Sequence, residues 1–361
     1  MTIMNTYKRG SKLKKIVSVI AFIIFFILVL LILLFGKKVR TLSSLEKVDD
    51  HPLYVMHYYG GYGFEDFLKK GAMTDEELTK TIKREIVISN NLKELDFSKY
   101  ACSVFFAKNE KGEAISGRNL DDYDKPSLLL FTNAPGAYAS VSTVDISILG
   151  YNKFKNNMPE TSLLNRINLL AAPYIPLDGM NEYGLRVATL AVPHAEFSKD
   201  SEKKYIGYNQ IMRLILDYAK NVDESISLIK KYNIYDSQIA NKFGGGHIFV
   251  GDATGKSAIV EFIDGKIVVT ENIEPWQVAT NFIVNGVTHE DITDNRYLTA
   301  YDELKNKKGI ISEEEAMKLL SDVSQRSTNW SEVFNSVTGD IQIVMGKNYD
   351  KVKNFKLKMK N

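Results

Sequence analysis

The chain has 361 residues, with 46 basic and 44 acidic side chains and a formal net charge of +2. A balance so close to neutral gives no overall field that would attract nucleic acid. One cysteine excludes an internal disulfide framework and a cysteine-based zinc site, and the five histidines lack paired metal-site spacing, so we expect no metal or other cofactor.

The first predicted element is a transmembrane helix over residues 16–35, which contain no charged residue, Gly or Pro. At about 1.5 Å per residue this run reaches roughly 30 Å, the thickness of the hydrocarbon core of a bilayer. Five basic residues precede it and three follow it, a weak bias that favours a cytoplasmic N-terminus at residues 1–15. A cleaved signal peptide is the alternative, but no small-x-small cleavage site follows Phe35. We predict a single-pass anchor in the cell membrane, with the remainder outside the cytoplasm.

Two segments are predicted between the anchor and the cysteine. Residues 36–50 are interpreted as a polar stalk. Residues 51–101 form a second segment, which begins with a stretch rich in aromatic residues and glycine (51–72) that we expect to pack on another part of the chain. A helix over about 75–88 follows, and Thr74 is its predicted cap.

From Cys102 onward, short strands and helices alternate. The apolar patterns predict strands at 102–107, 113–119, 128–133, 185–192, 247–252 and 257–262, and a hairpin at 330–346. Helices are expected at 207–219, at 223–231 with Asp223 leading, and at 312–324 with a capping box of Ser312 and Glu315. Strand pairs, then paired helices, then strand pairs again favour an α+β layered domain over residues 102–361. His247 is interpreted as a residue at the start of a strand.

The lone cysteine begins one strand of a predicted hairpin. Arg118 and Asp121 lie where the partner strand ends, so the hairpin would bring both to face Cys102. A neighbouring Arg favours the reactive thiolate. If the Ala101–Cys102 bond were cut, the new α-amine, with a pKa of about 7.7–8, could act as base for its own thiol. From the residues alone, a core cysteine beside a surface ion pair is the alternative.

Residues 102–121, CSVFFAKNEKGEAISGRNLD, resemble the nucleophile segment of the choloylglycine hydrolase superfamily of N-terminal nucleophile (Ntn) hydrolases. This group includes conjugated bile acid hydrolases, penicillin V acylases, acid ceramidase and N-acylethanolamine acid amidase. Four later segments resemble its motifs in the same order: DGMNEYGL at 178–185, VATN at 278–281, NRY at 295–297 and WSEVFN at 330–335. Each segment alone would be weak, but the ordered set is a specific signal.

The resemblance implies a four-layer αββα sandwich and a role for each matching residue. Cys102 would be the nucleophile, and its released amine would accept and return protons. Arg118 would lie beside the sulfur, and Asp121 would orient the amine. Arg296 would position the nucleophile network or the substrate, although a solvated helix end is the alternative for this residue.

The resemblance also implies an oxyanion hole, since a tetrahedral intermediate needs fixed donors aimed at its developing negative charge. Asn181 would contribute its backbone N–H, and Asn281 would contribute its side-chain amide. For Asn181, a turn residue that tolerates the left-handed conformation is the alternative.

The 101 residues before Cys102 depart from bile acid hydrolases, whose cysteine generally follows the initiator methionine. The layout looks more like acid ceramidase and N-acylethanolamine acid amidase, whose precursors cut themselves into two chains that stay together. We therefore hypothesise that self-cleavage before Cys102 leaves residues 1–101 noncovalently associated with 102–361.

The leading hypothesis is a membrane-anchored amidase that hydrolyses a linear, non-peptide C–N bond in a small amphiphilic amide, of the N-acyl lipid or conjugated sterol class. An acyltransferase of the same fold and a catalytically silent surface-binding domain are the alternatives. Loops at 133–145 and 193–206 are expected to shape the substrate pocket, and their residues do not name the substrate.

Overall fold

The computed structural model describes residues 2–74, 77, 101–122, 124–193, 195–235 and 246–360. The helix predicted at 75–88 therefore lies, apart from residue 77, outside the described residues. Its predicted cap is present, because Thr74 Oγ1 accepts a hydrogen bond from the Glu77 N–H at 3.2 Å.

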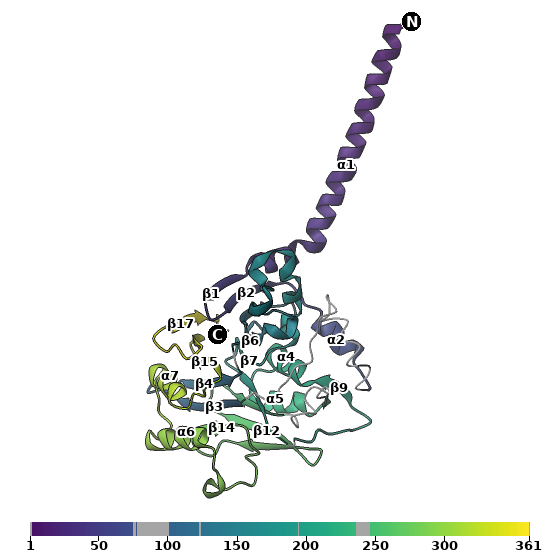
Figure 1. Ribbon diagram of the computed structural model, residues 1–361. Helices are drawn as coiled ribbons and strands as arrows, with labels where there is room; N and C mark the ends of the chain where they lie inside the picture. The colour runs from purple at the N-terminus through teal and green to yellow at the C-terminus, as the bar shows by residue number, and fades with distance from the viewer. Residues whose placement is uncertain are drawn as a thin grey trace.

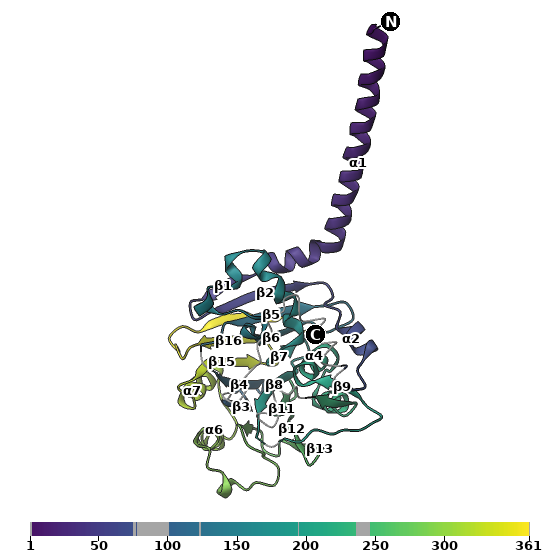
Figure 2. The same cartoon turned by 45° about the vertical axis from the view of Figure 1, so that its right-hand side comes forward.

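Two sheets stack face to face in the body of the molecule (Figures 1 and 2). In the described residues the larger sheet has nine strands, in the spatial order β1 (Glu46–Asp49), β2 (Leu53–Tyr59), β5 (Ser127–Asn133), β6 (Ser140–Asp145), β7 (Asp178–Asn181), β8 (Arg186–Ala191), β11 (Gly246–Gly251), β12 (Ser257–Ile263) and β13 (Lys266–Glu271). The smaller has six, in the order β14 (Gln277–Ala279), β3 (Ala101–Lys108), β4 (Ala114–Asp121), β15 (Thr328–Asn335), β16 (Asp340–Met345) and β17 (Lys353–Lys356). A separate parallel pair joins β9 (Lys204–Gly207) to β10 (Tyr232–Tyr235).

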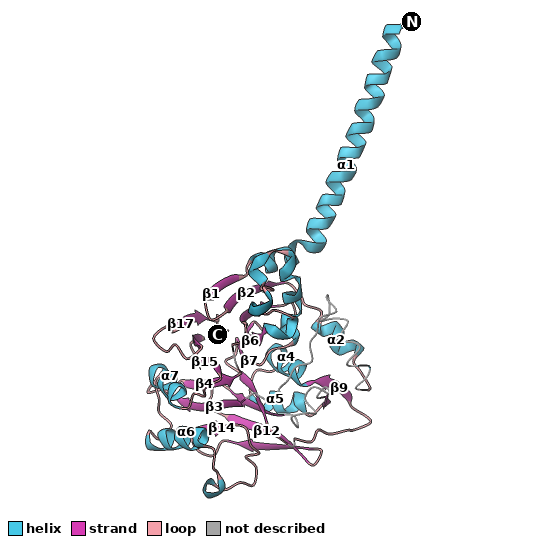
Figure 3. Cartoon of the chain, viewed as in Figure 1, coloured by secondary structure: helices cyan, strands magenta, loops and turns pink. Residues whose placement is uncertain are grey.

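Helices cover the outer face of each sheet (Figure 3). The α-helices described are α1 (Thr2–Ser43), α2 (Phe64–Lys70), α4 (Tyr208–Tyr218), α5 (Val222–Ile229), α6 (Asn295–Asn306) and α7 (Glu313–Asp322). The 3-10 helices described are η2 (Ile146–Leu149), η3 (Lys153–Lys155), η4 (Pro159–Thr161), η5 (Leu164–Tyr174) and η7 (His289–Asp291). Apolar faces of α4, α5 and η5 share one core with the nine-stranded sheet, and those of α6 and α7 share another with the six-stranded sheet. A third core lies between the sheets. This is the αββα sandwich that the resemblance implied.

The local predictions held where short-range patterns decide structure. Ser312 and Glu315 form the predicted capping box of α7, and the strands predicted at 102–107 and 113–119 form the antiparallel pair β3–β4. One helix start was wrong. α5 begins at Val222, because Asn221 rather than Asp223 provides the cap and accepts a hydrogen bond from the Glu224 N–H.

The stalk prediction for residues 36–50 was also wrong, because these residues are built into the domain. α1 extends to Ser43, and residues 46–49 form an edge strand. Thr41 is fully buried, and its Oγ1 accepts a hydrogen bond from the Tyr59 N–H at 2.9 Å. Arg166 donates to the Leu42 carbonyl at 2.9 Å, so the end of α1 is fixed to both β2 and η5.

The aromatic segment after residue 50 packs on the core as expected, and it does so as a strand. β2 pairs in parallel with β5 along its whole length, from Leu53 opposite Ser127 to Tyr59 opposite Asn133. Leu53, Tyr54 and Met56 have no exposed surface. Residues that precede Cys102 in sequence therefore supply an interior strand of the larger sheet.

α1 projects from the body as a single long helix (Figure 1). Several of its large apolar side chains are exposed, among them Phe22 at 68% and Phe25 at 64%. Taken over the part of the chain that the structure describes, no helix is both long and apolar enough to cross a membrane. The anchor at residues 16–35 stays a prediction.

Candidate active site

Cys102 lies near the start of β3, with its side chain in the core between the two sheets. In the β3–β4 ladder Cys102 pairs with Leu120, and Val104 pairs with Arg118. Residues two apart on a strand share one face, so Arg118 projects toward the same side as the cysteine. Its Nη2 lies 3.6 Å from the sulfur, as the hairpin predicted.

A carboxylate from the opposite sheet holds the Arg118 guanidinium in place. Arg118 Nη1 donates to Asp178 Oδ2, and Nη2 also donates to the Thr189 carbonyl at 2.8 Å. Arg118 and Asp178 are both fully buried. Asp178 opens the DGMNEYGL segment, but no pattern in the sequence marked it as a partner of Arg118. This ion pair joins the two sheets and fixes the position of the guanidinium that faces the Cys102 thiol.

Both backbone polar groups of Cys102 are hydrogen-bonded to side chains. Its N–H donates to Asn281 Oδ1 at 2.7 Å, and its carbonyl accepts from Arg296 Nη1 at 3.0 Å. Arg296 Nη1 also lies 3.1 Å from Asn281 Oδ1. Asn281 follows β14 and Arg296 lies in the first turn of α6, so segments far apart in sequence converge on one residue.

Asp121 joins this cluster through Arg296. Its Oδ2 lies 3.4 Å from Arg296 Nη1, and its Oδ1 accepts from the Thr328 hydroxyl. Asp121 pairs across the ladder with Ala101, the residue before the nucleophile. Burial raises the pKa of this carboxyl, while Thr328 and Arg296 act in the opposite direction.

Asn181 does not join the cluster, which corrects the role predicted for its backbone. The Asn181 N–H already donates to the Leu185 carbonyl at 3.1 Å. Its side chain donates to the carbonyls of Leu216 and Ala219 at the end of α4. Asn181 thus stabilises a turn, and Ala191 is the residue that lies beside the site, since its carbonyl accepts from Asn281 Nδ2 at 2.7 Å.

Replacing Arg118 should show how its charge affects the pKa of the Cys102 thiol. Burial raises the pKa of Cys102, and the Arg118 cation lowers it, with a smaller lowering effect from Arg296. Arg118→Gln should therefore raise the thiol pKa further, and Arg296→Gln should raise it less. Thiolate absorbance against pH measures this directly, since Cys102 is the only cysteine. Lys108→Gln, at the far end of β3, is the charge-matched control; a shift as large as that of Arg118→Gln would contradict the assignment.

Behind the arginine, a second buried carboxyl, that of Glu332, lies close to Asp178. Glu332 pairs with Arg118 across the β4–β15 ladder, has no exposed surface, and accepts from the Thr143 hydroxyl. Burial and then the neighbouring Asp178 raise its pKa well above the ordinary value of 4.5. Two charged carboxylates this close together in the buried interior would repel each other, so one of them holds a proton, and we assign it to Glu332.

This proton gives stability a predicted pH dependence. Above pH 4.5 the unfolded chain releases the Glu332 proton while the folded chain keeps it, so stability falls as pH rises toward the folded pKa. The slope from this group is about 1.4 kcal/mol per pH unit. Glu332→Gln should remove that slope in urea unfolding measured over a pH series. The exposed substitution Glu290→Gln should leave it in place, and equal slopes in wild type and Glu332→Gln would refute the assignment.

His247, near the start of β11 as predicted, supports the loop that carries Asn281. The ring is buried, and its Nε2 lies 2.9 Å from the Thr280 carbonyl. Within the described residues no cluster of His, Cys, Asp and Glu could hold a metal ion.

A family model for "Linear amide C-N hydrolases, choloylglycine hydrolase family" matches residues 102–308. The chain belongs to this family. The match begins at the cysteine on which Arg118, Asn281 and Arg296 converge.

One curated protein and two solved structures are similar to this chain. A penicillin V acylase from Pectobacterium atrosepticum is 30% identical over 111 residues, which cover 29% of each chain. A mutant of the conjugated bile acid hydrolase from Clostridium perfringens superposes with a TM-score of 0.53 and 18% identity, covering 72% of this chain and 93% of that one. The penicillin V acylase from Agrobacterium tumefaciens gives 0.51 and 18%, over 71% and 86%. These structures share the fold with this chain.

Proposed function

We propose that this chain is a cysteine Ntn amidase that cuts its own Ala101–Cys102 bond and then hydrolyses a small amphiphilic amide beside a membrane. One observation carries the proposal. The sulfur, the N–H and the carbonyl of Cys102 each contact a different polar side chain, those of Arg118, Asn281 and Arg296. A cysteine that only fills the core has no need of three such partners.

The proposed self-cleavage begins with an attack of the Cys102 thiol on the preceding carbonyl. The Cys102 sulfur would add to the Ala101 carbonyl carbon, the C–N bond would break, and the thiol proton would end on the released nitrogen. Water would then hydrolyse the resulting thioester to give the Ala101 carboxylate and a free thiol. Asn281 Oδ1, which already accepts the Cys102 N–H, would orient the new amine.

The released amine supplies the base that the thiol needs. Because burial raises the pKa of the Cys102 thiol, a thiolate is not preformed at neutral pH. The neutral α-amine would take the thiol proton as the sulfur attacks the substrate carbonyl, and would pass it to the leaving amine. Water would then deacylate the thioester with the same amine as base.

Asn281 is also the proposed oxyanion donor. An amide NH₂ group has two hydrogens, and one of them donates to the Ala191 carbonyl. Within the described residues the other hydrogen has no acceptor. It is the donor we assign to the tetrahedral intermediate, in place of the Asn181 backbone.

The substrate class and the anchor complete the proposal. The names of two similar proteins refer to penicillin V and to conjugated bile acids, which both contain an amide bond. An N-acyl lipid or conjugated sterol would suit a chain whose α1 exposes Phe22 and Phe25. Residues 16–35 would anchor the chain in the cell membrane, with the catalytic part outside the cytoplasm.

Mass spectrometry of active protein tests the central step. We expect two pieces, residues 1–101 and 102–361, that separate only under denaturing conditions. A fully active, intact chain of 40.8 kDa would remove the proposal. Alkaline carbonate washing of membranes from expressing cells tests the anchor separately, because a chain that washes free is not membrane-spanning.

A further inference from the structure

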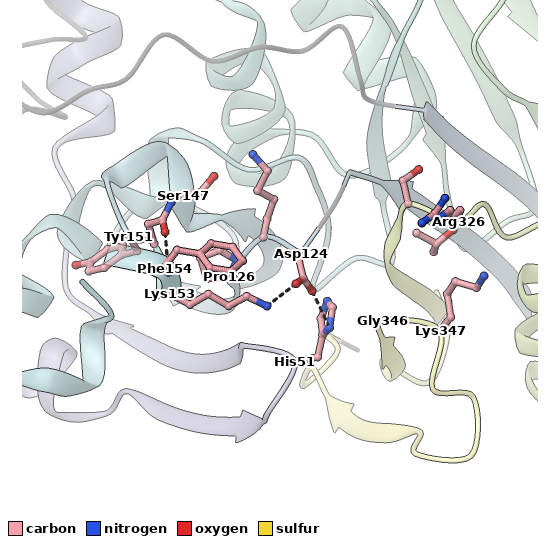
Figure 4. A pocket seen from close by; sticks show the side chains of 14 residues that line it. His51, Asp124, Pro126, Ser147, Tyr151, Lys153, Phe154, Arg326, Gly346 and Lys347 are labelled. Atoms are coloured by element: carbon pink, nitrogen blue, oxygen red, sulfur yellow. Dashed lines mark hydrogen bonds and ion pairs between the residues drawn. The ribbon is translucent and has the colours of Figure 1, made fainter. Parts of the chain in front are cut away.

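A cavity of about 640 Å³ opens at the end of the domain where β4 finishes. Five separate parts of the chain form its walls: the β1–β2 turn, residues 124–126, the segment from η2 to η3, the loop at 326–328 and the loop at 346–347. This volume is within the range of small-molecule sites. In Figure 4, Asp124 points toward Lys153 and His51, and Arg326 and Lys347 lie on the opposite wall, at the right of the view.

Cations dominate the lining. Lys125, Lys153, Arg326 and Lys347 face a single acidic side chain, that of Asp124. Both Asp124 oxygens are already occupied, Oδ2 by Lys153 Nζ and Oδ1 by His51 Nδ1 at 3.3 Å.

The opposite wall carries uncompensated charge. Among the described residues, the Lys125 ammonium pairs only with Asp122, at 3.6 Å. No ion pair among the described residues involves Arg326 or Lys347. A concave wall with one excess sign of charge raises the local concentration of the opposite ion.

We infer that this cavity binds an oxyanion group, a carboxylate, sulfonate or phosphate, with Arg326 and Lys347 as its principal cations. Arg presents a planar fork that fits such a group through two parallel hydrogen bonds, and Lys adds a mobile point charge. Ser147, Asn152 and Ser327 line the same space and supply neutral polar groups. The volume exceeds that of one inorganic ion, so the oxyanion is one end of a larger ligand or one of several small ions.

The cavity connects to the candidate active site through Thr328. This residue lines the cavity, and its hydroxyl donates to Asp121 Oδ1. Thr328, Asp121 and Ala101 lie opposite one another on three adjacent strands, so Thr328 is about 10 Å from the bond proposed for cleavage. An oxyanion here is therefore within the span of a small substrate, or can act on the Asp121–Arg296 pair as a separate anion.

Binding and activity together test the site. Calorimetric titration of the full chain with inorganic phosphate should show saturable binding that Arg326→Gln and Lys347→Gln each weaken by about tenfold. Both side chains are exposed, so folding should be unaffected. Lys266→Gln, an exposed lysine on the strand at the far edge of the nine-stranded sheet, is the matched control. Phosphate affinity that is equal in all four proteins overturns the inference.

A pair of substrates then shows whether the anion is part of the substrate or a separate ion. This second experiment rests on the proposed function. An N-acyl glycine and the N-acyl ethanolamide of the same chain length differ in the terminal carboxylate. A rise in KM for the acyl glycine alone, in Arg326→Gln and Lys347→Gln, assigns the site to the substrate's end group. Equal KM values with weakened phosphate binding assign it to a separate anion. Phosphate binding that depends on Arg326, in a chain that hydrolyses neither amide, supports the site while the amidase proposal fails.

Discussion

Replacing Cys102 by alanine should abolish amide hydrolysis, with a loss of kcat of about 10⁴-fold or more. The methyl group cannot attack a carbonyl, and no other described side chain occupies the position between Arg118 and Asn281. The same variant should migrate as one intact chain of 40.8 kDa on a denaturing gel, because the proposed self-cleavage uses the same sulfur. An assay panel of fatty-acyl ethanolamides, ceramides and bile acid conjugates measures the loss.

The neighbouring substitution Ser103→Ala is the control for that experiment. Ser103 is also buried on β3, and its hydroxyl has no hydrogen-bond partner among the described residues. Its loss should leave both cleavage and turnover close to wild type. Hydrolysis that persists in Cys102→Ala would defeat both the amidase and the acyltransferase hypotheses, since both need the thiol.

Arg118→Met should destabilise the folded chain by about 3–5 kcal/mol, because it leaves the Asp178 carboxylate fully buried without its cation. Urea unfolding at neutral pH measures the effect. Adding Asp178→Asn to the same chain should restore part of the lost stability, since the buried carboxylate is then neutral, while the buried Arg186 cation nearby keeps its charge. This rescue separates loss of the ion pair from general damage to the core.

An exposed ion pair provides the matched comparison. Lys318 and Asp322 pair on α7 with side chains that are 73% and 46% exposed. Lys318→Met should have little effect on stability, because water screens an exposed ion pair. If Arg118→Met costs no more than Lys318→Met, the Arg118–Asp178 contact does not hold the two sheets together as described.

The sequence was most informative where short-range patterns determine structure. Alternation over residues 102–119 was enough to predict the hairpin and the approach of Arg118 to Cys102. The capping box of Ser312 and Glu315 likewise depends on residues three apart. Asn281 and Arg296 were found because their short motifs match a known family in order.

Long-range pairing was not predictable in the same way. β2 pairs in parallel with β5 across some seventy residues, and nothing local in 53–59 marks that partner. Asp178 was missed because its role depends on an arginine from the other sheet. Asn181 was assigned the wrong role because a motif match identifies a segment but not which backbone N–H is already used inside a turn.

The place of β2 inside the larger sheet has a consequence for the cleaved molecule. If the bond before Cys102 is cut, one covalent chain becomes two that share a sheet, and unfolding also releases them from each other. Refolding then requires an encounter between two molecules, so the midpoint of thermal denaturation would rise with protein concentration. The midpoint of the intact precursor would not depend on protein concentration. The intact chain could refold by itself after unfolding, whereas the stability of the cleaved protein would be set by how slowly its two chains dissociate.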